Sequence, residues 1–298
     1  MTYHKNLLIC ILLILITNKI HSQDSKEVLD SQDTQDSLNT ANTQEKMTAW
    51  QAIKYDGLSI YGSVKNAYTQ PFRWKGKDWL TFGGIMAGTT ILLAADDPAN
   101  EYFAEQAEDI PEFVREASFR FGKPLFNYGL TTSVYALGLI TKNKKIRKTG
   151  VLLIASATAG GLLQTVSKTL VGRARPLTGK GNLHFKFYSG GDAGFHSFPS
   201  GHAILSITTA YAIGKQFKNP FIKGGIYALG MLSPISRLWE EAHWLTDVVL
   251  STALSIVIVD GIERYLEKKE RYVYGLKKNK INWNLSLGAG RIGVIGRF

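Results

Sequence analysis

Six long apolar stretches, separated by short polar and charged segments, occupy most of the chain from residue 79 onward. They are rich in Leu, Ile, Ala, Gly and Thr, and the first four contain no proline. Such stretches without intervening strand patterns are typical of an all-α bundle rather than of a parallel sheet. We therefore predict about six core helices, over residues 79–95, 125–140, 149–166, 203–213, 221–235 and 244–259.

The segments on either side of these stretches have different patterns. Residues 1–22 combine a basic start, an apolar run over 7–16 and a plausible cleavage position after Ser22, which is typical of a signal peptide; an uncleaved anchor is the alternative. We expect residues 23–75 to be a linker, disordered over 23–46, followed by an amphipathic segment that packs on the main domain or on a membrane surface. The main domain is expected over 76–270. The tail, 271–298, has a possible strand where Trp283, Leu285 and Leu287 alternate with polar residues.

Two features of the apolar stretches disagree about a membrane. Each stretch is shorter than the ~20 residues that a spanning helix usually needs, and Lys223 and Asp247 lie within them, which favours a soluble bundle. If all six cross, however, the basic clusters at 73–77, 142–148, 215–223 and 264–280 fall on one side and the acidic stretch 96–116 on the other, as the positive-inside rule requires. We expect a membrane-embedded bundle. A cleaved signal peptide conflicts with this topology, because it leaves the N-terminus outside whereas the pattern places Arg73 inside.

Charge and cysteine content narrow the function classes. The formal net charge is +11, which suits a membrane surface or anionic substrates, and we find no zinc-ligand spacing and no RNA-binding aromatic signature. We expect no nucleic-acid partner. The one cysteine, Cys10, lies within the first apolar run, so no disulfide can form within the chain.

Three short stretches carry the unusual polar residues: a K-x6-R-P pattern from Lys168 to Pro176, P-S-G-H at 199–202, and an S-R-x5-H-x3-D pattern from Ser236 to Asp247. Lys168, Arg175 and Arg237 are cations at the predicted ends of apolar helices, where they are costly unless an anion neutralises them. Arginine and lysine together suit phosphate oxygens. We expect Pro176 to end the third helix just past Arg175.

The P-S-G-H stretch opens the fourth predicted helix. Ser200 is a suitable N-cap, and the free N–H groups at a helix start attract an anion. Gly201 would let a phosphate oxygen approach the backbone, and His202 would stand beside it. We therefore predict that Ser200 and Gly201 bind phosphate together with the three cations.

His243 and Asp247 are four residues apart, so on a helix they share one face. A carboxylate that accepts a proton from one imidazole nitrogen leaves the other nitrogen as an oriented nucleophile. We predict that His243 attacks phosphorus, that Asp247 orients it, and that His202 protonates the leaving oxygen and then activates water. Because the cations supply the electrostatic stabilisation, we expect no metal and no other cofactor.

Together the three stretches resemble the signature of the type 2 phosphatidic acid phosphatase (PAP2) superfamily, which includes lipid phosphatases, bacterial acid phosphatases and vanadium haloperoxidases. The resemblance covers roughly residues 79–265, and every signature residue is present. It implies an all-α bundle, with the roles given above for His243, His202 and Asp247. The six-helix spacing looks most like that of bacterial membrane lipid phosphatases, whose site faces the extracytoplasmic side.

The expected activity is therefore hydrolysis of a phosphomonoester or diphosphate through a phosphohistidine. The expected substrate is a lipid, such as phosphatidic acid, phosphatidylglycerol phosphate or undecaprenyl diphosphate. The expected location is the bacterial inner membrane with the site facing the periplasm. A soluble, broad-specificity periplasmic acid phosphatase is the main alternative. A lipid phosphotransferase, a vanadium haloperoxidase and a non-enzymatic membrane protein are further alternatives.

Overall fold

The computed structural model describes residues 48–267, 282–288 and 291–297. The signal peptide expected over 1–22 and the disordered linker expected over 23–46 lie outside these residues. So does most of the basic cluster at 264–280.

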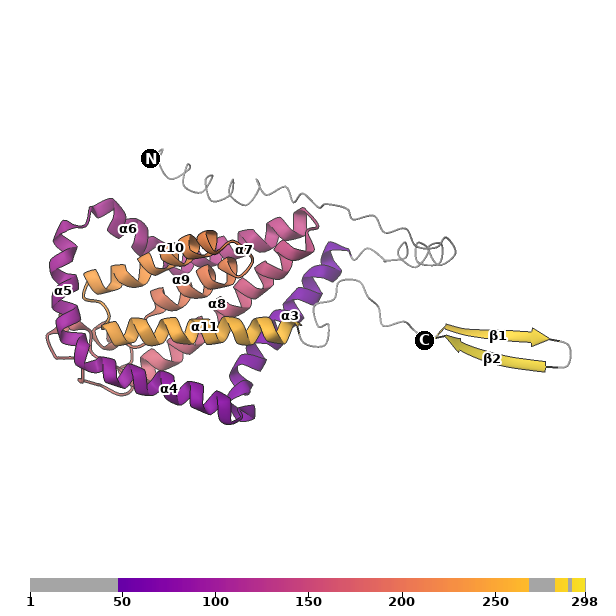
Figure 1. Ribbon diagram of the computed structural model, residues 1–298, viewed down its shortest axis with the longest axis horizontal. Coiled ribbons are helices and arrows are strands. Elements are labelled where there is room, and N and C mark those ends of the chain that lie inside the picture. The colour runs from indigo at the N-terminus through magenta and orange to yellow at the C-terminus, as the bar shows by residue number, and fades with distance from the viewer. Residues whose placement is uncertain (1–47, 268–281, 289–290, 298) are drawn as a thin grey trace. The chain divides into compact units, whose positions relative to one another are not determined.

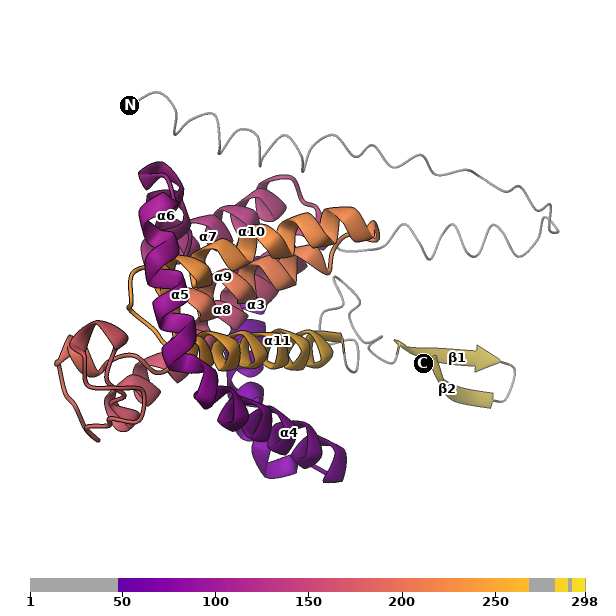
Figure 2. The same cartoon turned by 60° about the vertical axis from the view of Figure 1, so that its left-hand side comes forward.

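The described body is built of α-helices, as Figures 1 and 2 show. The helices are α3 (Ala49–Thr69), α4 (Gly76–Leu92), α5 (Asp96–Asp109), α6 (Glu112–Phe121), α7 (Pro124–Ile140), α8 (Lys144–Val171), α9 (Gly201–Gly214), α10 (Pro220–Trp239) and α11 (Leu245–Glu267). The short 3-10 helices are η1 (Gln70–Arg73), η2 (Leu93–Ala95), η3 (Pro176–Thr178) and η4 (Ala193–Phe195). Each of the six apolar stretches forms a helix, so the predicted all-α class is confirmed.

Polar caps decide where several of these helices begin. The side chain of Asn143 accepts a hydrogen bond from Ile146 N (3.1 Å) at the start of α8, and Asn219 accepts from Phe221 N (2.8 Å) at the start of α10. Ser200 caps α9, as predicted. These side chains satisfy N–H groups that have no partner within a helix, which fixes the entry of each helix into the bundle.

The core lies around α8, which packs against α7, α9, α11 and α3, while α9 also packs against α10 (Figure 1). Buried Val151, Leu152 and Leu153 of α8 form one cluster with Val259 and Ile262 of α11. Small residues let the helices approach closely: a Cβ added to Gly160 would lie 2.4 Å from Ile204 Cγ2. The amphipathic segment expected over 47–75 forms α3 and η1, and α3 packs on this core.

The two ends of the bundle carry different sets of charged residues. Because the helices run in alternating directions, segments far apart in the sequence share an end. At one end, Lys148 pairs with Glu267 (3.2 Å), and Lys215 pairs with Glu263 (2.5 Å) and Asp260. At the other end Arg173, which follows α8, pairs with Asp247 in the first turn of α11 (2.6 Å). The basic clusters at 142–148 and 215–223 therefore share one end, and the signature residues occupy the opposite end.

Among the described residues, three helical runs are long and apolar enough to cross a membrane by length and composition: Gly76–Asp109, Lys144–Val171 and Leu245–Glu267. With 17 and 14 residues, α7 and α9 are shorter than a usual span. The first run begins with α4, whose Leu80 and Ile91 are 76% and 75% exposed. An apolar helix that is exposed over much of its surface requires a cover, and lipid supplies one. The structure thus supports association with a membrane.

Two features of the fold were not predicted. The acidic stretch 96–116, for which no helix was predicted, forms α5 and the first half of α6. The strand expected around 283–287 is β1 (Asn282–Gly288), and it pairs with an antiparallel strand β2 (Arg291–Arg297), with Asn282 opposite Arg297. The strand β2 was not predicted because it contains Gly293 and Gly296, and glycine is depleted in strands.

Candidate active site

The three signature stretches meet at one end of the bundle. Lys168 lies in the last turn of α8 and Arg237 in the last turn of α10. His202 lies in the first turn of α9, and His243 lies in the turn before α11. Four of the predicted residues therefore lie at two helix C-termini and two helix N-termini that meet. A fifth predicted residue, Arg175, follows α8 in an extended segment.

His243 is almost fully buried, with 2% of its surface exposed. Its Nδ1 is in hydrogen-bond contact with the backbone carbonyl oxygen of Ser197, whereas Asp247 Oδ2 is 4.0 Å away. An Nδ1–H that donates to this carbonyl leaves Nε2 with a free lone pair, which a nucleophile requires. The expected direct Asp247–His243 hydrogen bond is therefore replaced, because His243 lies before α11 and the two residues do not share a helical face.

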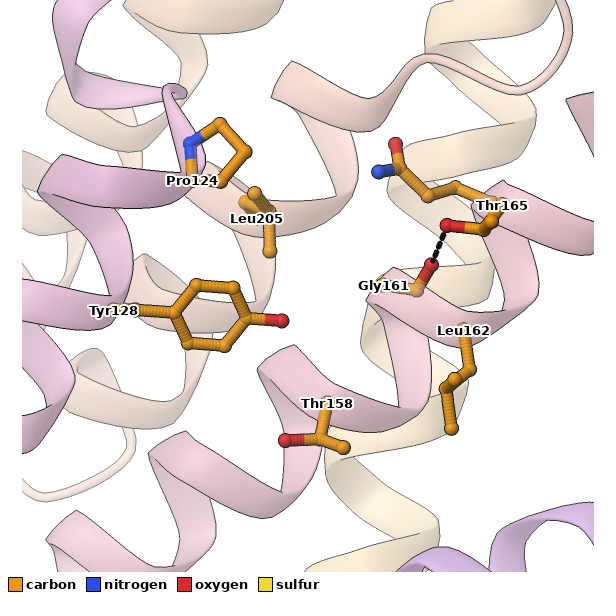
Figure 3. Close-up of a pocket in the computed structure, with 8 residues that line it drawn as sticks. Pro124, Tyr128, Thr158, Gly161, Leu162, Thr165 and Leu205 are labelled. Carbon is orange, nitrogen blue, oxygen red and sulfur yellow. Dashed lines mark hydrogen bonds between the residues drawn. The ribbon is translucent and has the colours of Figure 1, made fainter.

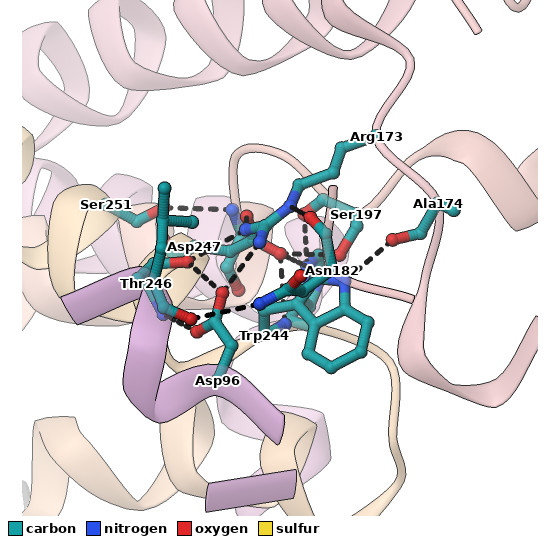
Figure 4. Close-up of polar contacts among 12 residues, drawn as sticks. Asp96, Arg173, Ala174, Asn182, Ser197, Trp244, Thr246, Asp247 and Ser251 are labelled. Atoms are coloured by element: carbon teal, nitrogen blue, oxygen red, sulfur yellow. Dashed lines mark hydrogen bonds and ion pairs between the residues drawn. The ribbon is translucent and has the colours of Figure 1, made fainter. Parts of the chain in front are cut away.

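Asp247 is linked to His243 by hydrogen bonds through Ser197. It is fully buried and accepts hydrogen bonds from Ser197 Oγ (2.5 Å), Trp244 N (3.0 Å) and Arg173 Nη1 (2.6 Å). Figure 4 shows these contacts converging on the carboxylate. The carboxylate thus binds the residue after His243 and the residue whose carbonyl His243 contacts, so its connection to His243 is indirect.

His202 stands against an aromatic ring from α6. Its imidazole stacks on Phe119, with centroids 4.9 Å apart and planes inclined by 14°. The guanidinium of Arg237 and the ammonium of Lys123 also lie over that ring, at 4.2 and 4.3 Å from its centroid. His202 Nε2 is buried and has no hydrogen-bond partner within the described residues. Phe119 therefore sets the position of both a predicted acid and a predicted phosphate ligand.

The site is strongly positive. Within residues 48–267, none of Lys168, Arg175 and Arg237 has a carboxylate within 4.0 Å, and Arg175 Nε is buried without a hydrogen-bond partner. Burial, reinforced by the charges of Arg237 and Lys168, lowers the pKa of His202 to about 3. Burial, reinforced by Lys168 and Arg175, also lowers the pKa of His243 well below its usual value. Both histidines are neutral at pH 7, and in the described part of the chain the nearby Asp247 carboxylate is paired with Arg173 rather than with these three cations.

The helix start at Ser200 and Gly201 is tightly packed. Ser200 is fully buried, and its backbone N–H donates to Ser251 Oγ (2.9 Å). A Cβ on Gly201 would lie 1.7 Å from Gln164 Oε1, so a larger residue here would displace the end of the Gln164 side chain. Gln164 also lines a cavity of about 300 Å³ between α7, α8 and α9 (Figure 3). This cavity is therefore next to the predicted phosphate-binding turn.

The expected helix end at Pro176 is wrong. Helix α8 ends at Val171, because Gly172 adopts a left-handed conformation (φ 57°) and its N–H closes the last turn on Lys168 O (3.2 Å). Pro176 begins η3 instead. The chain between them runs extended, which carries Arg173 into the interior and leaves Arg175 beside the histidines.

Several residues of the site were not singled out from the sequence. Arg173 lies inside the first signature stretch, so its position among the basic residues was an available signal. No sequence signal marked Ser197 or Phe119, because a contact through a backbone carbonyl or a stacked ring produces no spacing pattern. Glu240 and Glu241 bind neighbouring helices, through Arg115 (3.8 Å) and Asn100 (3.1 Å). Within the described residues no group of three His, Cys, Asp or Glu side chains could hold a metal ion.

A comparison with known protein families identifies the part of the chain that contains this site. The family model described as the PAP2 superfamily matches residues 149–271, which include all three signature stretches. Residues 149–271 of the chain are therefore similar to the PAP2 superfamily. The PAP2 match begins within α8, so α3 to α7 lie before it.

One solved PAP2 structure resembles the chain. It is the crystal structure of the first transmembrane PAP2 type phosphatidylglycerolphosphate phosphatase from Bacillus subtilis, with 23% identity and a TM-score of 0.44. The alignment covers 62% of this chain and 96% of that one. No curated protein matches the chain.

Proposed function

We propose that the chain is a metal-independent phosphatase that hydrolyses a phosphomonoester or diphosphate of a membrane lipid through a phosphohistidine on His243. The observation that carries the proposal is the end of the bundle where Lys168, Arg175 and Arg237 surround two neutral histidines. Among the described residues, none of these three cations is paired with a carboxylate. A phosphate group supplies the missing negative charge. The match of residues 149–271 to the PAP2 superfamily supports this proposal.

The contacts of the site suggest how the reaction proceeds. His243 Nε2 attacks phosphorus, and the bond from phosphorus to the leaving oxygen breaks as the P–N bond forms. His202 gives a proton to that oxygen. Because the pKa of free His202 is about 3, this proton arrives with a monoanionic substrate, or is taken up once the phosphate offsets the surrounding cations. Water then attacks the phosphohistidine, His202 accepts a proton from the water, and inorganic phosphate is released.

The phosphate oxygens would be held by the three cations and by the turn at Ser200 and Gly201. Two guanidinium groups and one ammonium suit the charge that spreads over these oxygens in the transition state. Since these cations are in place before substrate binds, little reorganisation is needed during the reaction. A metal ion is not required for this electrostatic role.

A lipid substrate and an outward-facing site follow from the surroundings of this end. The exposed apolar residues of α4 and the cavity beside Gly201 would accommodate an apolar leaving group. The basic clusters at 142–148 and 215–223 lie at the opposite end, so the positive-inside rule directs the site away from the cytoplasm. In a bacterial inner membrane the site would face the periplasm.

The proposal is tested by phosphate release from detergent-purified protein. The panel holds phosphatidic acid, phosphatidylglycerol phosphate, undecaprenyl diphosphate and a soluble phosphomonoester. We expect the lipids to be preferred and a chelator to have no effect. His243→Ala should abolish turnover, whereas His184→Ala, which alters an exposed loop histidine, should retain it. Activity of His243→Ala above a few per cent would refute the nucleophile assignment, and equal turnover of the soluble ester would favour an acid phosphatase.

A further inference from the structure

A buried ionic network behind His243 includes two residues that the proposed mechanism does not use. They are Arg173, which follows α8, and Asp96, the first residue of α5. Both are nearly inaccessible, with exposures of 3% and 0%. Asp96 lies well before residue 149, where the PAP2 match begins.

Arg173 uses its guanidinium in three directions. Its Nε donates to Asn182 O (2.8 Å), its Nη1 donates to Asp247 Oδ1 (2.6 Å) and Thr246 Oγ1 (2.8 Å), and its Nη2 donates to Asp96 Oδ2 (2.6 Å). Figure 4 shows the guanidinium between the two carboxylates. A lysine could not make these contacts, because an ammonium lacks the planar fork of donors.

Asp96 holds the start of α11 as well as Arg173. Its Oδ1 accepts from Thr246 N (2.9 Å), and its Oδ2 accepts from Thr246 Oγ1 (2.7 Å). A carboxylate at a helix N-terminus is favourable there because it satisfies an N–H group and meets the positive end of the helix dipole. Asp96 therefore fixes both the guanidinium and the backbone three residues after His243.

Both hydrogen bonds that fix Ser197 lead back to Arg173. The backbone N–H of Ser197 donates to Arg173 O (3.0 Å), and Ser197 Oγ donates to Asp247, which Arg173 binds. Ser197 in turn offers its carbonyl oxygen to His243 Nδ1. A change at Asp96 is thus transmitted through Arg173 to the group that sets the imidazole orientation.

We propose that Asp96 is a positioning residue for His243, acting through Arg173 and Ser197. The inference rests on the proposed function, because it assumes that His243 is the nucleophile. Asp96 also lies within the helical run Gly76–Asp109, which begins with the exposed apolar helix α4. A segment outside the PAP2 match therefore supports the reactive geometry of the residues inside it.

The test compares Asp96→Asn with a matched pair at the other end of the bundle. Asp56 and Arg147 form a second buried ion pair (3.0 Å), far from His243. Both Asp96→Asn and Asp56→Asn should lower the melting temperature. Only Asp96→Asn should lower kcat per folded enzyme on a soluble phosphomonoester, by about 10- to 100-fold, since small misplacements of a reacting group cost that much. KM and inhibition by inorganic phosphate should stay within about twofold, because the phosphate ligands are unchanged.

A kcat of Asp96→Asn within twofold of wild type, or an equal loss in Asp56→Asn, would overturn the proposal. If Asp96→Asn does not fold, Arg173→Lys replaces it, with the same fall in kcat expected and an unchanged kcat again overturning the proposal. An inactive wild-type protein would refute the proposed function instead. Hydrogen–deuterium exchange of 197–202 and 243–247 then still decides: faster exchange in Asp96→Asn than in Asp56→Asn supports the positioning role, and equal exchange overturns it.

Discussion

Replacing Asp247 by asparagine tests whether this carboxylate is part of a buried network or only a helical neighbour of His243. The carboxylate is fully buried and accepts from Arg173, Ser197 and Trp244. Asparagine keeps one carbonyl oxygen, but its NH₂ group would face a donor. The substitution therefore removes a charge and leaves at least one buried donor without a partner.

The size of the effect separates the two readings. Removing one partner of a buried ion pair costs about 3–5 kcal/mol, and we expect the lower value because Arg173 keeps its contact with Asp96. For a protein of this size, about 3 kcal/mol corresponds to a fall in Tm of about 6–12 °C. An exposed helical pair would contribute only about 0.3–0.5 kcal/mol, or about 1–2 °C.

Thermal unfolding in one detergent at one scan rate measures the difference. Asp192→Asn is the control, because Asp192 forms an exposed pair with Lys186 (3.4 Å) and should change Tm by less than 2 °C. A Tm for Asp247→Asn within 2 °C of wild type would refute the network described here. Such a result would favour the role predicted from the spacing alone, in which Asp247 is only a helical neighbour of His243.

Three further outcomes follow from the site. Burial lowers the pKa of His202 to about 3 and the pKa of His243 well below its usual value, so kcat/KM for a phosphomonoester should not decline through protonation of these rings between pH 6.5 and pH 5; a tenfold decline in a pH–rate profile would contradict this. Gly172→Ala should lower Tm by several degrees, because an added Cβ would lie 1.8 Å from Lys186 O at a positive φ; an unchanged melting curve would contradict it. Phe119→Leu should lower kcat/KM about threefold to tenfold by removing the ring on which His202 stacks, and steady-state kinetics at unchanged Tm would show it.

The helices could be predicted because their signal is local. Apolar runs and caps such as Ser200 are readable from neighbouring residues, and each of the six predicted helices formed. The helices α5 and α6 could not be predicted in this way. Their residues are mostly polar, and contacts such as Phe119 with His202 and Asn100 with Glu241 hold them against the bundle.

The site shows the same division between local and long-range information. The sequence spacing predicted that one site contains Lys168, Arg175, Arg237, His202 and His243. They meet because helices that alternate in direction place their ends on the same side of the bundle. The partner of His243 could not be deduced, because a backbone carbonyl 46 residues away carries no sequence signature. Likewise, Asp96 and Thr246 are 150 residues apart, and only the folded chain shows that they meet.

The length of α8 has a consequence for where the reaction would take place. Its 28 residues rise about 42 Å, and about 36 Å separate Lys144 from Lys168 along the helix axis. A bilayer has a hydrocarbon core about 30 Å thick. With Lys144–Lys148 among the headgroups of one leaflet, Lys168 would reach the headgroups of the other. A phospholipid would then meet the histidines at the depth where its phosphate already lies, and could react without leaving its leaflet.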